Sequence, residues 1–303
     1  MSDNDSMLFQ DALFRNKKGK IIEPPAIEGL VADTHAHLDM LDDPALALAR
    51  AAAHNVMLVC SVVDPAEDAK LTYDMLAEWL AQASYLLDGW GVAQTLPTCR
   101  IIAGVHPHAA DKFDADILNM TVACANHPAT VAIGEIGLDY HYDFSKRENQ
   151  RDVFRRQINL AHELRMPVVL HIRDAHDDAL AILRDEGVPK EGVLLHCFTS
   201  DVETLEPFLE LGCSVAFGGA LTFANSDAIR ESAKRVPLDK LLTETDCPYM
   251  APKPLRSTKS SPDHTIFVAD ALAEVRGVVE SEREAFFAQL FQNALDFFKV
   301  QFI

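Results

Sequence analysis

The chain lacks the features that would place it in a membrane or send it through a secretory pathway. No window of about 18 consecutive apolar residues occurs, which excludes a membrane-spanning helix. The first letters, MSDNDSM, are acidic and contain no apolar signal-peptide core. The six cysteines form no Cys-x-x-Cys pair, as is usual for reduced thiols. We therefore expect a cytoplasmic protein.

Positive charge is also scarce. The sequence holds 27 Lys and Arg against 46 Asp and Glu, a formal net charge of −19. Such a surface repels nucleic acid and anionic membranes on average. A phosphate-bearing substrate would therefore have to be attracted locally, by a few basic side chains or by bound cations.

What is present is the composition of a folded globular protein. Hydrophobic residues make up 49% of the chain and charged residues 24%, which argues against disorder or a low-complexity sequence. Residues 1–28 are polar and contain Pro, so we predict an N-terminal extension that is flexible or loosely packed. Residues 29–303 are predicted to form a single domain.

Eight short apolar runs alternate with longer amphipathic stretches after residue 30. The runs cover residues 31–37, 56–63, 100–107, 130–137, 167–173, 192–198, 213–219 and 241–248. Helices are predicted over residues 44–54, 66–83, 114–126, 146–165, 175–186, 201–211, 225–235, 264–276 and 281–299. The segment 84–98 is long for a connection and indicates a helix extension or a surface insertion.

This alternation predicts an α/β fold with a parallel sheet covered on both faces. Eight strands that alternate with eight helices, followed by a last helix over residues 281–299, favour a (β/α)8 TIM barrel, whose usual size is about 250 residues. An open, doubly wound sheet is the alternative. No Gly-x-Gly-x-x-Gly motif follows the first run, and the polar residues within the runs favour the barrel.

Those polar residues lie toward the carboxyl ends of the runs. They are His35, His37, Glu135, His171, His196 and Asp246. In a barrel, the carboxyl ends of all strands meet at one mouth, where active sites lie. Four imidazoles and two carboxylates are a typical ligand set for divalent metal ions, most simply two of them.

Each residue, taken alone, could have a purely structural role. One buried His on a strand is more often a hydrogen-bonded core residue than a ligand. A buried carboxylate without a partner is costly, however, and five runs each carry a ligand-type residue near the same end. We therefore predict a metal centre in which Glu135 bridges two ions.

The motifs that carry these residues resemble the TatD family of metal-dependent deoxyribonucleases. The resemblance covers about residues 29 to 300 and rests on ADTHAHLD (32–39), GVHPH (104–108), IGEIGLDY (133–140), PVVLHIRDA (167–175), LLHCFTS (194–200), TETDCPYMAP (243–252) and NALDFF (293–298). That family is a TIM-barrel branch of the amidohydrolase superfamily. Its members typically hydrolyse phosphodiester bonds in DNA, often as 3′–5′ exonucleases on single-stranded ends, with magnesium, manganese or zinc.

The resemblance implies a role for each ligand. His35 and His37 would hold one metal ion, and His171 and His196 the second. Glu135 would bridge the two ions. Asp246 would bind the first ion and handle the attacking water, so Glu135 and Asp246 are the predicted catalytic residues.

Three further residues are predicted to contact substrate. His106 lies at a mouth position and could donate a hydrogen bond to the scissile phosphate. Arg173 follows His171 by two residues and so points the same way along a strand. Arg256 belongs to a loop after the eighth run, where barrels often bind phosphate. We expect DNA to be bound locally at the mouth of a monomer, without a membrane partner.

Two other functions use the same residues. Water activated by the ions could instead cleave a carbonyl or aminoacyl bond in a cyclic amide, a lactone or a misacylated tRNA. A protein that binds metal without catalysis is the third hypothesis, which the intact ligand set disfavours.

Overall fold

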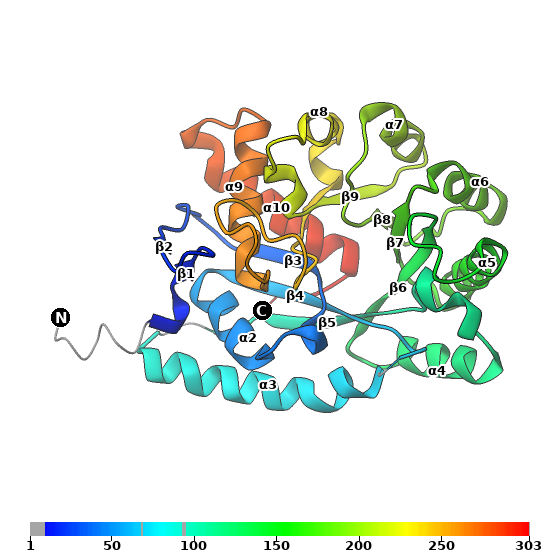
Figure 1. Ribbon diagram of the computed structural model, residues 1–303, viewed down its shortest axis with the longest axis horizontal. Coiled ribbons are helices and arrows are strands. Elements are labelled where there is room, and N and C mark those ends of the chain that lie inside the picture. The colour runs from blue at the N-terminus through cyan, green and yellow to red at the C-terminus, as the bar shows by residue number, and fades with distance from the viewer. Residues whose placement is uncertain (1–9, 68, 93–94, 303) are drawn as a thin grey trace.

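The computed structural model describes residues 10–67, 69–92 and 95–302. Its main sheet has eight parallel strands in the order β10-β9-β8-β7-β6-β5-β4-β3, so each strand pairs with its neighbour in sequence. The strands curl into a nearly closed barrel with helices around it (Figure 1). This arrangement confirms the predicted TIM barrel.

The strands alternate with helices along the whole barrel. The strands are β3 (Val31–Ala36), β4 (Val56–Val63), β5 (Thr98–Ala103), β6 (Thr130–Asp139), β7 (Val168–Arg173), β8 (Val193–Leu195), β9 (Ser214–Phe217) and β10 (Leu241–Thr243). The helices are α2 (Pro44–Ala53), α3 (Ala69–Trp90), α4 (Ala115–Ala125), α5 (Arg147–Leu164), α6 (His176–Glu186), α7 (Val202–Glu210), α8 (Asp227–Arg235), α9 (Thr265–Val275) and α10 (Arg283–Phe298). None of these described helices combines the length and apolar character that crossing a membrane requires.

Aspartate side chains mark where several helices begin. Asp43 accepts a hydrogen bond from the backbone N–H of Leu46 and precedes Pro44 at the first position of α2. Asp114 caps α4 in the same way. Such caps satisfy backbone donors that have no partner inside the helix. These aspartates therefore fix where α2 and α4 begin.

Side chains close the seam between the first and last strands of the barrel. The Thr34 hydroxyl donates to the Thr243 carbonyl at 2.9 Å, and the Thr243 hydroxyl donates to the Ala32 carbonyl at 2.8 Å. Beyond them, the Asp246 N–H donates to the His35 carbonyl at 2.9 Å. These bonds hold the end of β3 beside the segment that follows β10, although β3 and β10 share no continuous ladder of backbone hydrogen bonds.

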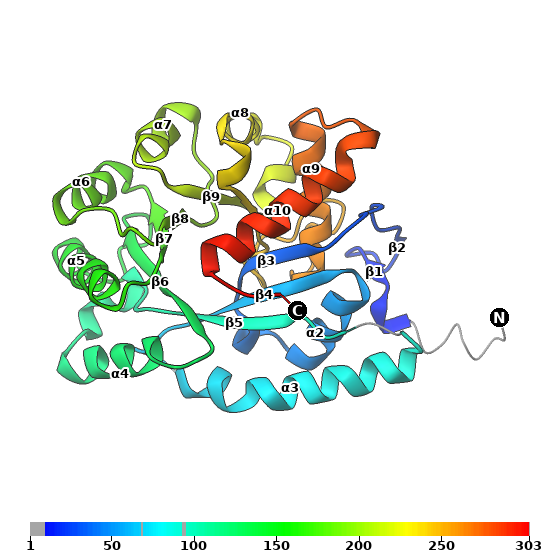
Figure 2. The same cartoon turned by 180° about the vertical axis from the view of Figure 1, so that it is seen from behind.

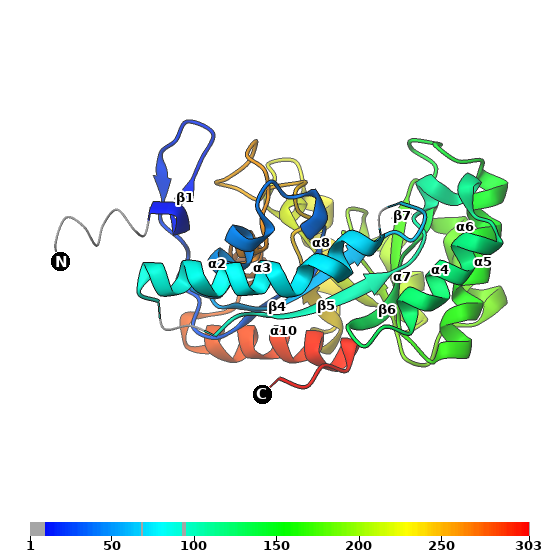
Figure 3. The same cartoon turned by 90° about the horizontal axis from the view of Figure 1, so that it is seen from below.

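The C-terminal helix closes the other end of the barrel. Phe291, Leu295 and Phe298 of α10 join a buried cluster with residues near the amino ends of the strands, such as Ala32 and Leu242. Figures 2 and 3 show α10 lying across these strands, and Figure 3 places it on the side opposite β1 (Phe14–Arg15). The mouth at the carboxyl ends of the strands is thereby left for the polar residues.

The described part of the N-terminal extension contacts the barrel. It contains the small hairpin of β1 and β2 (Ile21–Ile22). The Phe14 ring is 1% exposed and packs edge-on against Phe267 of α9 at 4.9 Å between centroids. The division of the chain at residue 28 stays a prediction.

The element bounds differ from the predicted ones mainly at the carboxyl ends of strands. β8 and β10 end at Leu195 and Thr243, so His196 and Asp246 lie just beyond the ladders. β5 ends at Ala103, and a short 3-10 helix, Pro107–Lys112, begins after His106. α3 continues to Trp90, which confirms a helix extension for the first part of the segment 84–98.

Candidate metal centre

Glu135 on β6 lies at the centre of the predicted cluster, with 4% of its surface exposed. Its Oε2 atom is 3.2 Å from His35 Nε2 and 3.9 Å from His37 Nε2. Its Oε1 atom is 2.6 Å from His171 Nδ1 and 2.8 Å from His196 Nε2. The two carboxylate oxygens thus face different predicted ligands, Oε2 those of β3 and Oε1 His171 and His196, which is the arrangement that a bridging carboxylate requires.

Asp246 completes the side of the cluster that Oε2 faces. Its Oδ1 atom lies 3.5 Å from His37 Nε2 and 4.0 Å from His35 Nε2. The seam between β3 and β10 produces this proximity. All six predicted ligands therefore lie around one point, and one ligand atom from each of His35, His37 and Asp246 lies within 4.8 Å of the others. Their role as ligands stays a prediction.

The electrostatics of the cluster favour ionised carboxylates. Burial alone would raise the pKa of Glu135, but the imidazoles of His196, His106 and His35 outweigh burial and hold this pKa well below its usual range. The pKa of Asp246 is likewise lowered, because the hydrogen bond with His37 and the nearby imidazoles exceed the effect of burial. Ionised carboxylates are the form that binds metal ions.

The buried nitrogens of His35 supply a direct test of whether the cluster suits a metal ion. His35 is fully buried, and its Nδ1 atom has no hydrogen-bond partner among the described residues. Its Nε2 atom lies 3.2 Å from Glu135 Oε2 but forms no hydrogen bond with it. Burial and the neighbouring His196 lower the pKa of His35, which favours the neutral imidazole. A buried neutral nitrogen without a partner is costly unless it coordinates an ion. The donor set therefore fits divalent metal.

Asp139 is a residue of this site that the sequence analysis did not identify. Its Oδ2 atom accepts hydrogen bonds from His171 Nε2 at 3.0 Å and from His108 Nε2 at 2.9 Å. A carboxylate on the far nitrogen of a ligand histidine fixes the orientation of its ring. Asp139 lies four residues after Glu135 on the same strand, so the two-residue period of β6 is the signal that could have found it.

Two more buried carboxylates fix the backbone around the ligands. Asp33 accepts from the Thr245 N–H at 2.8 Å and from the Thr245 hydroxyl at 2.6 Å. Glu244 accepts from the Cys197 N–H at 2.6 Å and lies 3.4 Å from His196 Nδ1. Asp33 was also not identified from the sequence, although it precedes His35 by two residues. Each carboxylate ties one ligand-bearing segment to the next.

Gly137 permits the close approach of β6 and β7 beside the cluster. Its φ angle is +141°, and a Cβ atom there would lie 2.0 Å from the carbonyl oxygen of His171. Any side chain at this position would push β7 away and displace the His171 ring. The glycine is thus required by the geometry of the site.

The predicted substrate-binding residues occupy different places. His106 Nε2 lies 3.5 Å from Glu135 Oε1, so His106 belongs to the cluster. The Arg173 side chain is exposed, with its guanidinium 4.8 Å from the centroid of the Tyr142 ring. The exposed Arg256 guanidinium lies 3.8 Å from the centroid of the Phe223 ring. Contact of His106, Arg173 and Arg256 with substrate stays a prediction.

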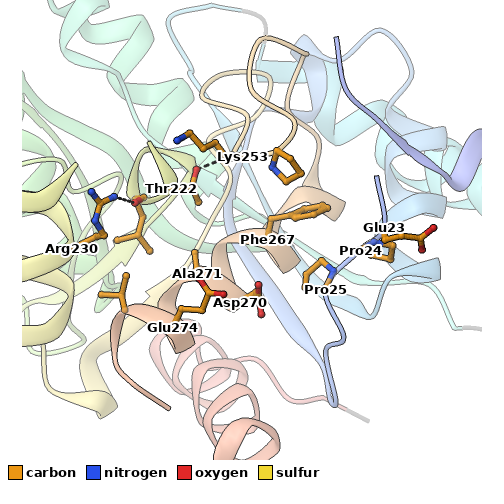
Figure 4. A pocket seen from close by; sticks show the side chains of 13 residues that line it. Glu23, Pro24, Pro25, Thr222, Arg230, Lys253, Phe267, Asp270, Ala271 and Glu274 are labelled. Carbon is orange, nitrogen blue, oxygen red and sulfur yellow. Dashed lines mark hydrogen bonds between the residues drawn. The ribbon is translucent and has the colours of Figure 1, made fainter. Parts of the chain in front are cut away.

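A cavity of about 460 Å³ lies away from this cluster (Figure 4). The N-terminal segment, the loop after β10 and helix α9 line it, and none of the six predicted ligands does. Its side chains carry charges of both signs, with Arg230 and Lys253 on one side and Asp270 and Glu274 on the other. The cavity is therefore separate from the candidate metal centre.

Comparison with known proteins agrees with this architecture. The family model described as TatD related DNase matches residues 32–299. The metal-dependent hydrolase YcfH of Escherichia coli, described as uncharacterized, is 37% identical over 259 residues, which cover 83% of this chain and 90% of YcfH. The 3′-5′ ssDNA/RNA exonuclease TatD of Erwinia billingiae is 37% identical over 218 residues, or 69% of this chain and 82% of that protein. The crystal structure of the TatD homologue YjjV from Escherichia coli has a TM-score of 0.77 at 25% identity and covers 89% of this chain and 98% of YjjV.

The barrel, the imidazole and carboxylate cluster, and these relatives define an enzyme of the metal-dependent hydrolase class. Within that class, the chain belongs to the TatD related DNase family, because the family model spans most of its length. The resemblance drawn from the sequence motifs is thereby confirmed.

Proposed function

We propose that the protein hydrolyses phosphodiester bonds in DNA, as a 3′–5′ exonuclease acting on single-stranded ends. The observation that carries this proposal is Glu135, whose two oxygens face different predicted ligands. That geometry supports two divalent ions, magnesium, manganese or zinc, at one centre. The relative from Erwinia billingiae, named as a ssDNA/RNA exonuclease, supports the choice of substrate.

The side chains divide the work of the reaction. Bound at the six ligands, divalent ions would supply Lewis acidity toward water and phosphate oxygen. Asp246 is ionised because its pKa is lowered, so its carboxylate can accept the proton of the attacking water. The oxygen of that water forms the new bond to phosphorus as the bond from phosphorus to the 3′ oxygen breaks, and the 3′ oxygen leaves as a hydroxyl with a proton from solvent water.

The residues at the rim position the substrate. His106, beside Glu135 Oε1, donates a hydrogen bond to the scissile phosphate. Arg173 and Arg256 are exposed cations that contact neighbouring phosphates, and a guanidinium can bind phosphate through two parallel hydrogen bonds. The protein acts as a monomer on a strand held at the barrel mouth.

Metal removal tests the proposal directly. Protein stripped with EDTA and dialysed should lose cleavage of end-labelled single-stranded DNA, and added Mn²⁺ or Mg²⁺ should restore it. The same preparations are assayed with an aminoacyl ester. Equal cleavage by stripped and restored protein would refute the metal mechanism. Turnover of the ester without cleavage of DNA would instead identify carbonyl chemistry at the same centre.

A further inference from the structure

Two exposed aromatic rings stand side by side in the loop that follows β6. Tyr142 is 49% exposed and Phe144 is 66% exposed. Their rings are stacked, with centroids 5.3 Å apart and planes inclined by only 7°. Exposed apolar surface of this size is unfavourable in water and commonly marks a binding site. The pair offers a flat aromatic face next to the strand that carries Glu135.

A continuous set of contacts fixes this pair relative to the candidate metal centre. The His108 ring lies edge-on to Phe144, with centroids 4.8 Å apart, and His108 Nε2 donates to Asp139. The same carboxylate accepts from His171 and, through Oδ1, from the backbone N–H of Tyr142 at 3.0 Å. The aromatic pair is therefore held by the residue that orients a predicted metal ligand.

Positive charge lies over the Tyr142 ring of the pair. The guanidinium of Arg173 is 4.8 Å from the centroid of the Tyr142 ring. Arg173 is opposite Asp139 in the register of β6 and β7, so it stands on the same part of the rim. A flat aromatic face with an adjoining cation matches the two parts of a nucleotide, its base and its phosphate.

We propose that Tyr142 and Phe144 form a stacking platform for an unpaired nucleobase of the substrate, with Arg173 on the phosphate next to that base. This inference rests on the proposed function and adds to it the site that selects single strands. A base in a duplex is stacked and paired, so it cannot lie on the platform without being unpaired first. A base–aromatic contact tolerates every base, because each base has a π face.

A pair of oligonucleotides isolates the platform from the chemistry. One is an end-labelled single-stranded DNA, and the other is the same strand with abasic residues at its terminal positions. The native enzyme should prefer the base-bearing strand in kcat/KM by about 5-fold to 100-fold, the usual effect of losing one stacked base. In Phe144→Ala that preference should fall toward unity, and Phe144→Trp should restore it.

Binding without turnover supplies a second readout. A strand with terminal 2-aminopurine is added to Asp246→Asn protein, and stacking should quench its fluorescence. The quenching should disappear when Phe144→Ala is combined with Asp246→Asn. Tyr85→Ala is the matched control, because Tyr85 is 79% exposed on α3 and also has an aromatic ring in solvent.

The outcomes separate this inference from the function on which it rests. Cleavage of both strands with no preference by the native enzyme, or an unchanged preference in Phe144→Ala, overturns the platform and leaves the nuclease proposal standing. The exposed aromatic pair would then be interpreted as a contact surface for a protein partner. Failure to cleave either strand with added Mn²⁺ overturns both proposals.

Discussion

At the scale of single residues, Asp246 combines a proposed chemical role with an unusual backbone conformation. Its φ angle is +58°, a left-handed conformation that Asp and Asn tolerate better than most residues. Its carboxylate lies 3.5 Å from His37 and faces the point where the two groups of imidazoles meet. Asparagine at this position therefore keeps the backbone conformation and the size of the side chain while it removes the proposed base.

We expect Asp246→Asn to lower kcat on single-stranded DNA by roughly 100-fold or more, the usual contribution of a positioned base. The thermal unfolding midpoint should stay close to that of the native protein, because the backbone is retained. Initial rates and circular dichroism melts are the measurements. Asp227→Asn is the control, since Asp227 is a mostly exposed carboxylate at the start of α8. Native rates in Asp246→Asn would remove Asp246 as the base.

Asp139 is tested by metal affinity, because it contacts His171 and not the predicted ions. Asp139→Asn replaces an acceptor that serves both His171 and His108. The His171 ring loses its fixed orientation, and we expect the affinity for metal to fall by about 10-fold to 100-fold. Isothermal titration with Zn²⁺ or Mn²⁺ measures the change. Unaltered affinity would show that the contact has only a structural role.

At the scale of elements, the buried Asp263 connects the barrel to the N-terminal segment. Asp263 Oδ2 accepts two hydrogen bonds from Arg50, at 2.9 and 2.7 Å. The same guanidinium donates to the backbone carbonyls of Asp11 and Leu13. Although burial opposes ionisation, the charge of Arg50 lowers the pKa of Asp263 to about 2.

The sign of the pH dependence follows from that lowered pKa. A carboxyl group with a lower pKa in the folded state stabilises the fold above its unfolded pKa, and the stabilisation is lost as the pH falls toward its folded pKa. For Asp263 the window is from about pH 4 down to about pH 2. We expect Asp263→Asn to lower the free energy of unfolding by about 2 kcal/mol at pH 7.

Urea unfolding of the native protein and Asp263→Asn measures this difference at two pH values. The gap should be largest at neutral pH and shrink to roughly half at about pH 3, where the carboxyl of the unfolded chain is mostly protonated while that of the folded protein is still ionised. Asp227→Asn again serves as the control, because it removes one carboxylate from the surface. A gap that is the same at both pH values would show that Asp263 does not act through its charge.

The sequence predicts most elements of the barrel because apolar runs and amphipathic stretches alternate regularly. The exact ends of the strands cannot be predicted from the sequence, because a hydrogen-bonded ladder stops where the neighbouring strand stops. This occurs at Leu195 and Thr243. The six predicted ligands were found because each interrupts an apolar run. Asp33 was not found because its partner Thr245 is distant in sequence and lies beside it only when the barrel closes. Asp139 was not found because its partners His108 and His171 follow or belong to the two strands that flank β6, and the pairing of those strands is not written in the sequence of β6 alone.

At the scale of the whole molecule, the net charge of −19 opposes the approach of a polyanionic substrate. The predicted ions and the cations at the mouth attract phosphate only over short distances. Raising the salt concentration shortens the range of electrostatic interactions from about 30 Å at 0.01 M to about 8 Å at 0.15 M. The long-range repulsion is therefore screened first, before the local attraction at the mouth.

We expect kcat/KM for a single strand of about 20 nucleotides to rise or stay level as salt increases over this range, at fixed Mn²⁺ concentration. A dinucleotide carries too little charge to feel the repulsion and should change less. A protein that binds DNA through many basic side chains behaves in the opposite way, because its affinity falls steeply with salt. Initial rates for both substrates across a KCl series distinguish these two salt responses. A steep fall in kcat/KM for the long strand would contradict this expectation. It would mean that long-range attraction of DNA to the mouth outweighs the repulsion by the net charge.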